Sequence, residues 1–293
     1  MRLKSALAGY ATPFRLGQRS SIGNDMMSSN NSGEMEIETR KYKIVHTSAL
    51  TMVPPESEIQ VWDQLTELRT LARDPGLFRW PPHVNLLYPF VEIFDQEDDS
   101  EVERVMRKLQ EVTARTEPFN VTLDRFGLFG GKWRGVLWLN PSSSYTSQQS
   151  TMQDEPLIQL QKYLCDALSW YENGGNLCKS EFVPHLTISH YESIVAAKEA
   201  QSRLEQDYEP CSFHVDEIYL LNRNGDHGQF QVAATLPLGH GSCNKITVHD
   251  PQLRFCHMPL KEEEWVYQER IKLKQRRNVR GRRKLKEMNQ KIN

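Results

Sequence analysis

One five-residue pattern occurs twice in the chain and constrains the fold more than any other feature. Pro82–Leu86 reads PHVNL, and Pro184–Ile188 reads PHLTI. Both run proline, histidine, aliphatic residue, small hydrogen-bonding residue, aliphatic residue. Such alternation is typical of a half-buried β-strand, and proline is tolerated at a strand's first residue, where the missing N–H costs least. We therefore expect two similar strands, one in each half of a two-part domain.

Each expected strand carries its polar side chains on one face. Because side chains two apart on a strand share a face, His83 lies beside Asn85, and His185 lies beside Thr187. A lone histidine in a strand is more often structural than catalytic, but two copies in one context are harder to dismiss. Brought together, the strands would supply two proton-transfer groups and two groups that bind an anionic oxygen. This arrangement predicts phosphoester chemistry.

At these residues the chain resembles the 2H phosphoesterase superfamily, whose mark is two His-x-Thr/Ser motifs in pseudo-symmetric lobes. The segment His83–Phe90, HVNLLYPF, is similar to the HxTLLYPF segment of the 2′-5′ RNA ligase-like branch. The resemblance covers about residues 42–238. Asn85 departs from the family's threonine or serine, although an amide can still donate to a phosphate oxygen. Thr187 fits the family without alteration.

Length and composition indicate a soluble chain. The formal net charge is −2 over 293 residues, and the apolar runs are far shorter than the roughly 20 residues of a membrane-spanning helix. The five cysteines are odd in number and include no C-x-x-C pair. We therefore expect neither a disulfide framework nor a zinc site, and a reducing, intracellular compartment. No cofactor is expected.

Apolar spacing predicts alternating strands and helices between residues 41 and 240. Beside the two motif strands, the expected strands are 41–51, 119–126, 133–139, 213–221 and 230–236. The expected helices are 59–71, 100–112, 155–171 and 193–208, and a Ser/Gln-rich loop at 142–150 separates the halves. This order indicates an α+β domain of two similar lobes, each a small sheet backed by helices. The resemblance implies a central cleft with one motif strand on each side.

Both ends of the chain have biased compositions. Residues 1–40 are poor in large apolar residues, which is typical of a disordered N-terminus or of an organellar transit peptide. Residues 241–293 form an expected C-terminal tail, in which Arg270–Lys286 holds ten basic residues and no acidic one. The tail resembles a basic helix broken at Gly281. RNA attachment, nuclear import and a solvated tail all remain open, so the compartment is undecided between mitochondrion or plastid and nucleus.

The resemblance implies a mechanism for hydrolysis of a ribose 2′,3′-cyclic phosphate. One imidazole, His185, would take a proton from the attacking water, and the other, His83, would give one to the departing ribose oxygen. The roles would reverse for the opposite reaction direction. Asn85 and Thr187 would bind the phosphate oxygens. Neither motif contains the carboxylate cluster of a two-metal phosphatase, so no metal is expected.

Tyr88, Lys132 and Arg134 are candidate substrate-binding residues. Tyr88 follows the first motif, and the two cations cluster with Phe129 at a turn near the expected cleft. Stacking of a base on an aromatic ring is worth roughly 1–3 kcal/mol, so these residues could bind the nucleotide part of a substrate.

Other aromatic and histidine side chains have a structural interpretation. For Tyr88, Trp133 and Trp138, packing in the core is at least as good an explanation as substrate binding, because aromatic residues at strand spacing usually pack inward. We interpret His190 as structural. Five further histidines lie in no comparable context: His214, His227, His240, His249 and His257.

We therefore predict a monomeric cyclic nucleotide or RNA phosphodiesterase of the 2H type. The alternative class is a nucleotide- or RNA-binding module, in which Asn85 marks reduced catalysis and the basic tail drives RNA association. Within the enzyme class, 2′-5′ RNA ligation, trimming of RNA 3′ ends and hydrolysis of ADP-ribose cyclic phosphate remain open.

Overall fold

The strands of the central chain join in one antiparallel sheet. The computed structural model describes residues 43–92, 99–145, 155–168, 181–241 and 245–292, so the expected N-terminal segment 1–40 lies outside the described residues. The strand order is β11-β10-β9-β2-β3-β7-β6-β5-β8. The bounds are β2 Ser48–Met52, β3 Val84–Leu87, β5 Phe119–Gly131, β6 Arg134–Tyr145, β7 Leu186–Tyr191, β8 Cys211–Val215, β9 Glu217–Asn222, β10 Gln231–Pro237 and β11 Thr247–Leu253. A separate antiparallel pair consists of β1 Ile44–Val45 and β4 Phe90–Val91.

The sheet bends into two lobes. Only Asp216 separates β8 from β9, although five strands lie between them in the sheet. With strands about 4.8 Å apart, a flat sheet would hold β8 and β9 roughly 29 Å from each other, and one linking residue spans far less. The strands from β11 to β3, here the β3 lobe, must therefore approach those from β7 to β8, here the β7 lobe. The lobes are joined by the two motif strands, through the pair of Val84 with Leu186.

The expected α+β class with two lobes is confirmed. The lobes do not coincide with the halves of the sequence, however. Strands β9 and β10 come from the second half but belong to the β3 lobe, where β9 pairs with both β2 and β10. The predicted strands 41–51 and 213–221 are each split in two, since the chain turns at residues 46–47 and changes lobe at Asp216. The described part of the 142–150 loop extends β6, where the Ser142 hydroxyl donates to the Asp124 carboxylate.

Five helices are described, and four of them pack against the sheet. Their bounds are α2 Ile59–Leu71, α3 Asp99–Arg115, α4 Pro156–Ala167, α6 Ile194–Leu204 and α7 Glu264–Ile292. Helix α2 packs on β7 and β8, α6 on β5 and β6, and α3 on α4 and β10. The predicted stripe of α3 is buried throughout, whereas Ile59 and Leu71 at the ends of α2 are exposed. Among the described residues, no helix is both long and apolar enough to cross a membrane.

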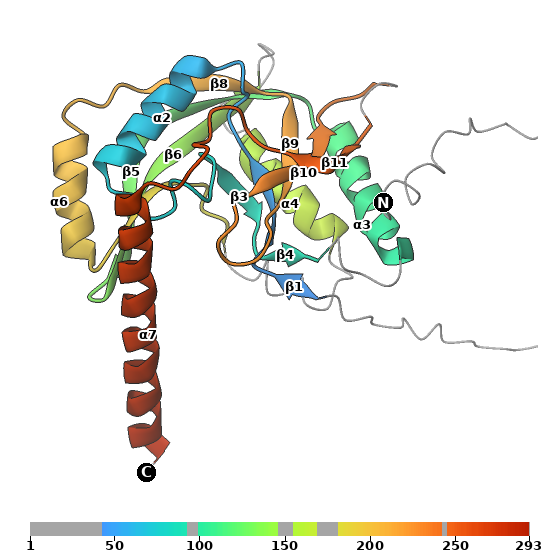
Figure 1. The fold of residues 1–293 in the computed structure, drawn as a ribbon. Helices are drawn as coiled ribbons and strands as arrows, with labels where there is room; N and C mark the ends of the chain where they lie inside the picture. Colours follow the sequence, from blue (N-terminus) through green and yellow to red (C-terminus); the bar gives the residue numbers. More distant parts are fainter. Residues whose placement is uncertain (1–42, 93–98, 146–154, 169–180, 242–244, 293) are drawn as a thin grey trace, which may run out of the picture.

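The packed structure continues past residue 240, where we expected the domain to end. Strand β11 pairs with β10 at the edge of the sheet. Phe255 and Met258 are buried together with Trp62 in one hydrophobic cluster. Helix α7 begins against the body, where Val266 is buried, and then projects away from it (Figure 1). The helix runs through Gly281 without the expected break.

The cysteines differ in part from the expectation. Cys165 is disulfide-bonded, whereas Cys211 and Cys256 are free. An odd number of cysteines therefore does not exclude a single disulfide, although it argues against a framework in which every cysteine is paired.

Candidate active site

A cavity of about 570 Å³ is lined by residues of both lobes and of α7. Six of the seven predicted site residues line it: His83, Asn85, Tyr88, Arg134, His185 and Thr187. Lys132 is not among the lining residues, and its Nζ lies 4.7 Å from the centre of the Trp133 ring. The roles of all seven stay predictions, but the structure brings the two motifs to one place.

The register between β3 and β7 explains how the two motifs meet. Val84 and Leu186 are paired and fully buried. Because the strands are antiparallel, the residues that flank this pair lie on the opposite face, toward the cavity. Counting outward gives two cross-strand pairs on that face, Asn85 with His185 and His83 with Thr187. The two histidines therefore occupy diagonal positions of one four-residue arrangement.

Both histidines are held in the same tautomer by the same local geometry. Nδ1 of His83 lies 2.8 Å from the carbonyl oxygen of Pro81, and Nδ1 of His185 lies 2.8 Å from that of Val183. A carbonyl oxygen only accepts, so each Nδ1 carries a proton and donates it. Each Nε2 therefore keeps its lone pair, and that of His83 accepts a hydrogen bond of 3.1 Å from the Asn85 side-chain amide. This is the arrangement that proton transfer at two places requires.

Burial changes the charge state of both imidazoles. Desolvation, with a smaller contribution from the nearby Arg69 cation, lowers the pKa of His83 to about 3. Desolvation also lowers the pKa of His185, with Arg134 adding to the effect. Both rings are therefore neutral in the free protein at neutral pH. A bound anion would offset the desolvation and make protonation of one ring easier.

Aromatic rings enclose each histidine. Trp80 stacks on His83 with ring centres 4.4 Å apart, and Phe230 stacks on Trp80 at 3.6 Å. Phe129 meets His185 edge-on at 5.0 Å and stacks on Trp138. These rings position the imidazoles and account for their desolvation.

Tyr88 belongs to the same group of aromatic rings. Its ring meets Trp80 edge-on at 5.3 Å and His46 at 5.6 Å. Since Tyr88 also lines the cavity, its packing role and its predicted substrate role are compatible. Trp133 is 55% exposed and does not line this cavity.

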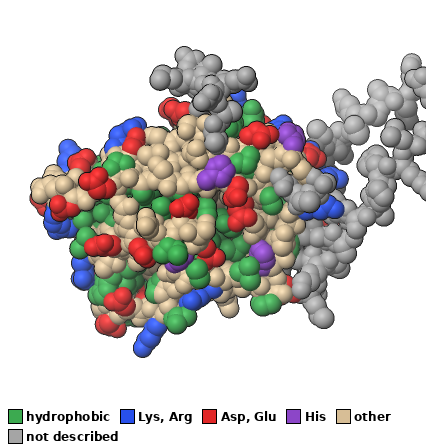
Figure 2. Space-filling view, turned by 90° about the horizontal axis from the view of Figure 1, so that it is seen from above, with side chains coloured by type: hydrophobic (Ala, Val, Ile, Leu, Met, Phe, Trp, Pro, Cys, Tyr) green, Lys and Arg blue, Asp and Glu red, His purple; other side chains and the backbone are tan. Residues whose placement is uncertain are grey.

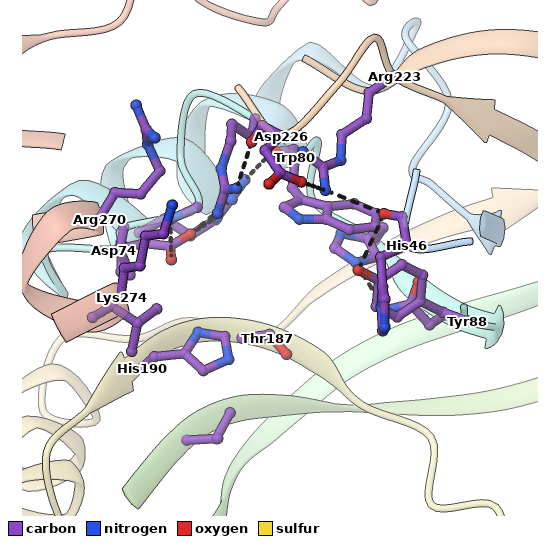
Figure 3. Close-up of a pocket in the computed structure, with 18 of the residues that line it drawn as sticks. His46, Asp74, Trp80, Tyr88, Thr187, His190, Arg223, Asp226, Arg270 and Lys274 are labelled. Carbon is purple, nitrogen blue, oxygen red and sulfur yellow. Dashed lines mark hydrogen bonds and ion pairs between the residues drawn. The ribbon is translucent and has the colours of Figure 1, made fainter. Parts of the chain in front are cut away.

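His190, for which we expect a structural role, lies at the cavity, and that role stays a prediction. It lines the cavity together with Thr187, and both project from β7 (Figure 3). The cause is a β-bulge: Leu137 pairs with Ser189 but Trp138 pairs with Thr187, so β7 has one extra residue. A bulge reverses the alternation beyond it, which turns His190 toward the cavity and buries Ser189.

Two further histidines line the cavity, and no sequence pattern pointed to either of them. His46 precedes β2, and His227 lies in the loop between β9 and β10. Nδ1 of His227 accepts a hydrogen bond of 2.8 Å from the Arg270 guanidinium of α7. Neither residue lies in a recognisable motif, so only the fold identifies them.

The cavity is strongly cationic, which the sequence did not indicate. Six cationic side chains and two acidic ones line it; the cations are Arg69, Arg79, Arg134, Arg223, Arg270 and Lys274, and the acids are Asp74 and Asp226. Elsewhere, basic and acidic side chains are interspersed over the face seen in Figure 2. The excess of positive charge favours an anionic ligand. Within the described part of the chain, no group of three or more His, Cys, Asp or Glu side chains could hold a metal ion.

One family of known proteins matches the chain. A family model described as the 2′-5′ RNA ligase superfamily matches residues 55–227, which is more than half of the chain. Two crystal structures of LigT from E. coli, one with NADP+ and one in the apo form, each show 18% sequence identity and a TM-score of 0.36. They cover 66% of this chain and 98% and 94% of their own chains. Among curated proteins there is no significant match.

Proposed function

The chain belongs to the 2′-5′ RNA ligase superfamily and has the α+β fold of the 2H phosphoesterases, and from this premise we propose that it hydrolyses 2′,3′-cyclic phosphates of RNA or nucleotides. The observation that carries the proposal is the pair of imidazoles, His83 and His185, in one cationic cavity. In each, a carbonyl oxygen accepts the Nδ1 proton, so Nε2 is the ring atom that we assign to proton transfer.

The reaction needs one base and one acid. The base takes a proton from the water that attacks phosphorus, and the acid donates a proton to the ribose oxygen whose bond to phosphorus breaks. The resemblance alone implied His83 as the acid. The pKa of about 3 makes the enclosed His83 ring hard to protonate, so we propose the reverse: His83 is the base, and His185 is the acid.

Thr187 and Asn85 supply hydrogen-bond donors beside the imidazoles, and Arg134 adds a cation on the cavity wall. Negative charge on the nonbridging phosphate oxygens grows as water adds, and donors fixed in advance stabilise it best. No metal is part of the proposal, since two imidazoles and these donors suffice for the proton transfers.

RNA is the proposed macromolecular partner. Helix α7 contributes Arg270 and Lys274 to the cavity and continues away from the body as a strongly basic helix. A strand whose cyclic end lies in the cavity would have its phosphates near this helix. Contacts of Lys and Arg with phosphates are strong at low salt and weaken steeply as salt rises.

The test is turnover of a panel of nucleoside 2′,3′-cyclic phosphates and cyclic-phosphate-ended RNAs by the full chain. We expect hydrolysis with and without a chelator, and its loss in His83→Ala and in His185→Ala, since each proton-transfer group contributes typically 10²–10⁴-fold. Retention of near-native turnover in either variant would contradict the two-histidine mechanism. Inactivation by chelator that a divalent metal reverses would contradict its metal independence.

One observation favours a binding module as the second candidate. The Asn85 amide donates to Nε2 of His83 over 3.1 Å and so occupies the lone pair that a base needs. If that hydrogen bond persisted with ligand bound, the cavity would bind cyclic nucleotides without hydrolysing them. Calorimetric binding without turnover would identify this case.

A further inference from the structure

Two arginines meet on the cavity wall beside the β9–β10 loop. Arg79 Nη1 donates to the Asp226 carbonyl oxygen over 3.2 Å, and Arg223 Nη1 donates to that of Gly225 over 2.8 Å. Arg223 also donates from Nη2 to the His46 carbonyl oxygen. Backbone carbonyls therefore hold both guanidinium groups in place, but a carbonyl supplies no full negative charge.

Other buried cations of this cavity have a carboxylate at close range. Arg69 lies 2.7 Å from Asp74, and Arg270 lies 2.6 Å from Glu262. Arg223, whose side chain is 7% exposed, reaches only the 81% exposed Asp226, at 3.7 Å. Among the described residues, no carboxylate forms an ion pair with Arg79.

The two guanidinium groups are also incompletely hydrogen-bonded. The Nε atoms of Arg79 and Arg223 are buried and have no partner among the described residues. Burial, together with repulsion from Arg223 and Arg270, lowers the pKa of Arg79 to about 10. Arg223 is buried and Arg79 is half-buried. A like-charge pair in such surroundings, with unused donors, is costly, and a bound anion would relieve both costs.

From this arrangement we infer that Arg79 and Arg223 form a second anion-binding subsite, for a phosphate other than the one attacked beside the histidines. The inference rests on the proposed function and narrows its substrate class. The preferred substrate carries a further phosphate, either the 5′-phosphate of a nucleotide or the phosphodiester that precedes the terminal ribose of an RNA. Both offer the same anionic oxygens to a guanidinium group.

The subsite is connected to the histidines within one cavity. The Arg223 guanidinium lies over the Phe230 ring at 5.1 Å, Phe230 stacks on Trp80, and Trp80 stacks on His83. The cavity volume of about 570 Å³ lies in the range of small-molecule sites, roughly 300–1,000 Å³. One nucleotide can therefore contact both places.

The kinetic test compares three substrates with the same terminal base. They are a nucleoside 2′,3′-cyclic phosphate, the same compound with a 5′-phosphate, and a dinucleotide with a cyclic phosphate end and a free 5′-hydroxyl. We expect the extra phosphate to raise kcat/KM by about tenfold or more, because hydrogen bonds to charged groups are stronger than those between neutral groups. The compound with the larger gain identifies the source of the phosphate.

In Arg79→Gln and Arg223→Gln, the ratio of kcat/KM with and without the extra phosphate should fall toward one. The matched control is Arg125→Gln, because the Arg125 side chain is 66% exposed, pairs with Asp124 and does not line the cavity. The control should keep the wild-type ratio. A wild-type ratio near one, or an unchanged ratio in both cavity variants, would overturn the subsite.

A binding measurement separates the subsite from the proposed function. A nucleoside 2′-monophosphate and the matching 2′,5′-bisphosphate are titrated calorimetrically into the full chain and into Arg223→Gln. Tighter binding of the bisphosphate that depends on Arg223 would support the subsite even if no cyclic phosphate were hydrolysed. Hydrolysis together with equal affinity for the two ligands would retain the function and overturn the subsite.

Discussion

The side-chain amide of Asn85 donates to Nε2 of His83 over 3.1 Å, so the residue that departs from the family's motif contacts the proposed base directly. The oxygen of the same amide, Asn85 Oδ1, is buried and has no hydrogen-bond partner among the described residues. In the free protein Asn85 therefore stabilises neutral His83. For catalysis the amide must leave Nε2, and a phosphate oxygen is an alternative acceptor for its N–H groups.

Replacement of Asn85 tests this relationship. We expect Asn85→Thr to preserve or raise kcat, because threonine restores a shorter donor and frees Nε2 of His83. We expect Asn85→Leu to weaken phosphate binding, because it removes the donor. Both variants are compared in kcat and KM on a nucleoside 2′,3′-cyclic phosphate. A leucine variant with unchanged kcat and KM would show that Asn85 does not contact the substrate.

The assignment of base and acid has its own test. A p-nitrophenyl phosphodiester of a nucleotide has a leaving group that needs no proton. His185→Ala, which lacks the proposed acid, should therefore retain most of its activity on this substrate while losing roughly 10²-fold or more on a cyclic phosphate. His83→Ala should lose activity on both. The opposite pattern would restore the assignment that the family resemblance implied.

The pH dependence of kcat/KM follows from the lowered pKa values of the free protein. His83 must be neutral and His185 protonated, and burial lowers the pKa of both rings below the ordinary 6.5. The productive combination is therefore most populated on the acid side of that value. We expect the maximum of kcat/KM below pH 6.5, measured with buffers of constant ionic strength. A maximum above pH 7 would contradict these shifts.

Acid should also destabilise the fold through His83. Its pKa is about 3 in the folded chain and about 6.5 when unfolded, so the unfolded state binds more protons between these values. The free energy of unfolding should fall as the pH drops from 6.5 toward 3, by on the order of 4 kcal/mol from this residue. Urea unfolding of the wild type and of His83→Gln measures the difference. Parallel pH curves would contradict the shift.

The sequence predicted the motif strands and the α3 stripe because both depend on local periodicity. The alternation in 82–86 and 184–188 is visible residue by residue, and burial of Val84 and Leu186 follows from it. The cationic lining of the cavity could not be predicted in this way. Arg79, Arg223 and Arg270 belong to three distant segments, which come together only through the strand order and the docking of α7.

Two differences between pattern and structure have identifiable physical causes. Alternation cannot register a bulge, so the sequence pattern gives no sign that His190 of β7 lines the cavity. Strand β11 is an edge strand with mostly exposed side chains. Its sequence therefore lacks the apolar pattern of a buried strand, which is why the pattern predicts an end of the domain near residue 240.

The ion pair between Arg69 and Asp74 should be important for stability. Both side chains are 4% exposed, and Arg69 contacts the carboxylate through two nitrogens, at 2.7 and 2.8 Å. Asp74→Ala leaves a buried arginine without its carboxylate, which typically costs about 3–5 kcal/mol, so we expect roughly this loss in urea unfolding. The control, Glu111→Gln, breaks the more exposed Lys108–Glu111 pair and should cost about 1 kcal/mol or less. Equal losses would contradict a structural role for the buried pair.

Truncation at two points separates the packing role of the C-terminal segment from its proposed RNA binding. Deletion from residue 242 removes β11, Phe255 and Arg270, so we expect loss of both folding and hydrolysis. Deletion from residue 279 spares the part of α7 whose Glu269 and Arg276 pair with Arg73 and Glu192 of the body.

The shorter deletion still removes six basic residues, Arg280, Arg282, Arg283, Lys284, Lys286 and Lys291. It should therefore leave hydrolysis of small cyclic nucleotides within about twofold of the full chain, because the cavity lining stays intact. Binding to single-stranded RNA should weaken, and the slope of log K against log salt should flatten by about 0.7 for each phosphate that the shortened helix no longer neutralises. Fluorescence anisotropy at several salt concentrations measures both. An unchanged affinity and slope would mean that the projecting half of α7 does not bind RNA.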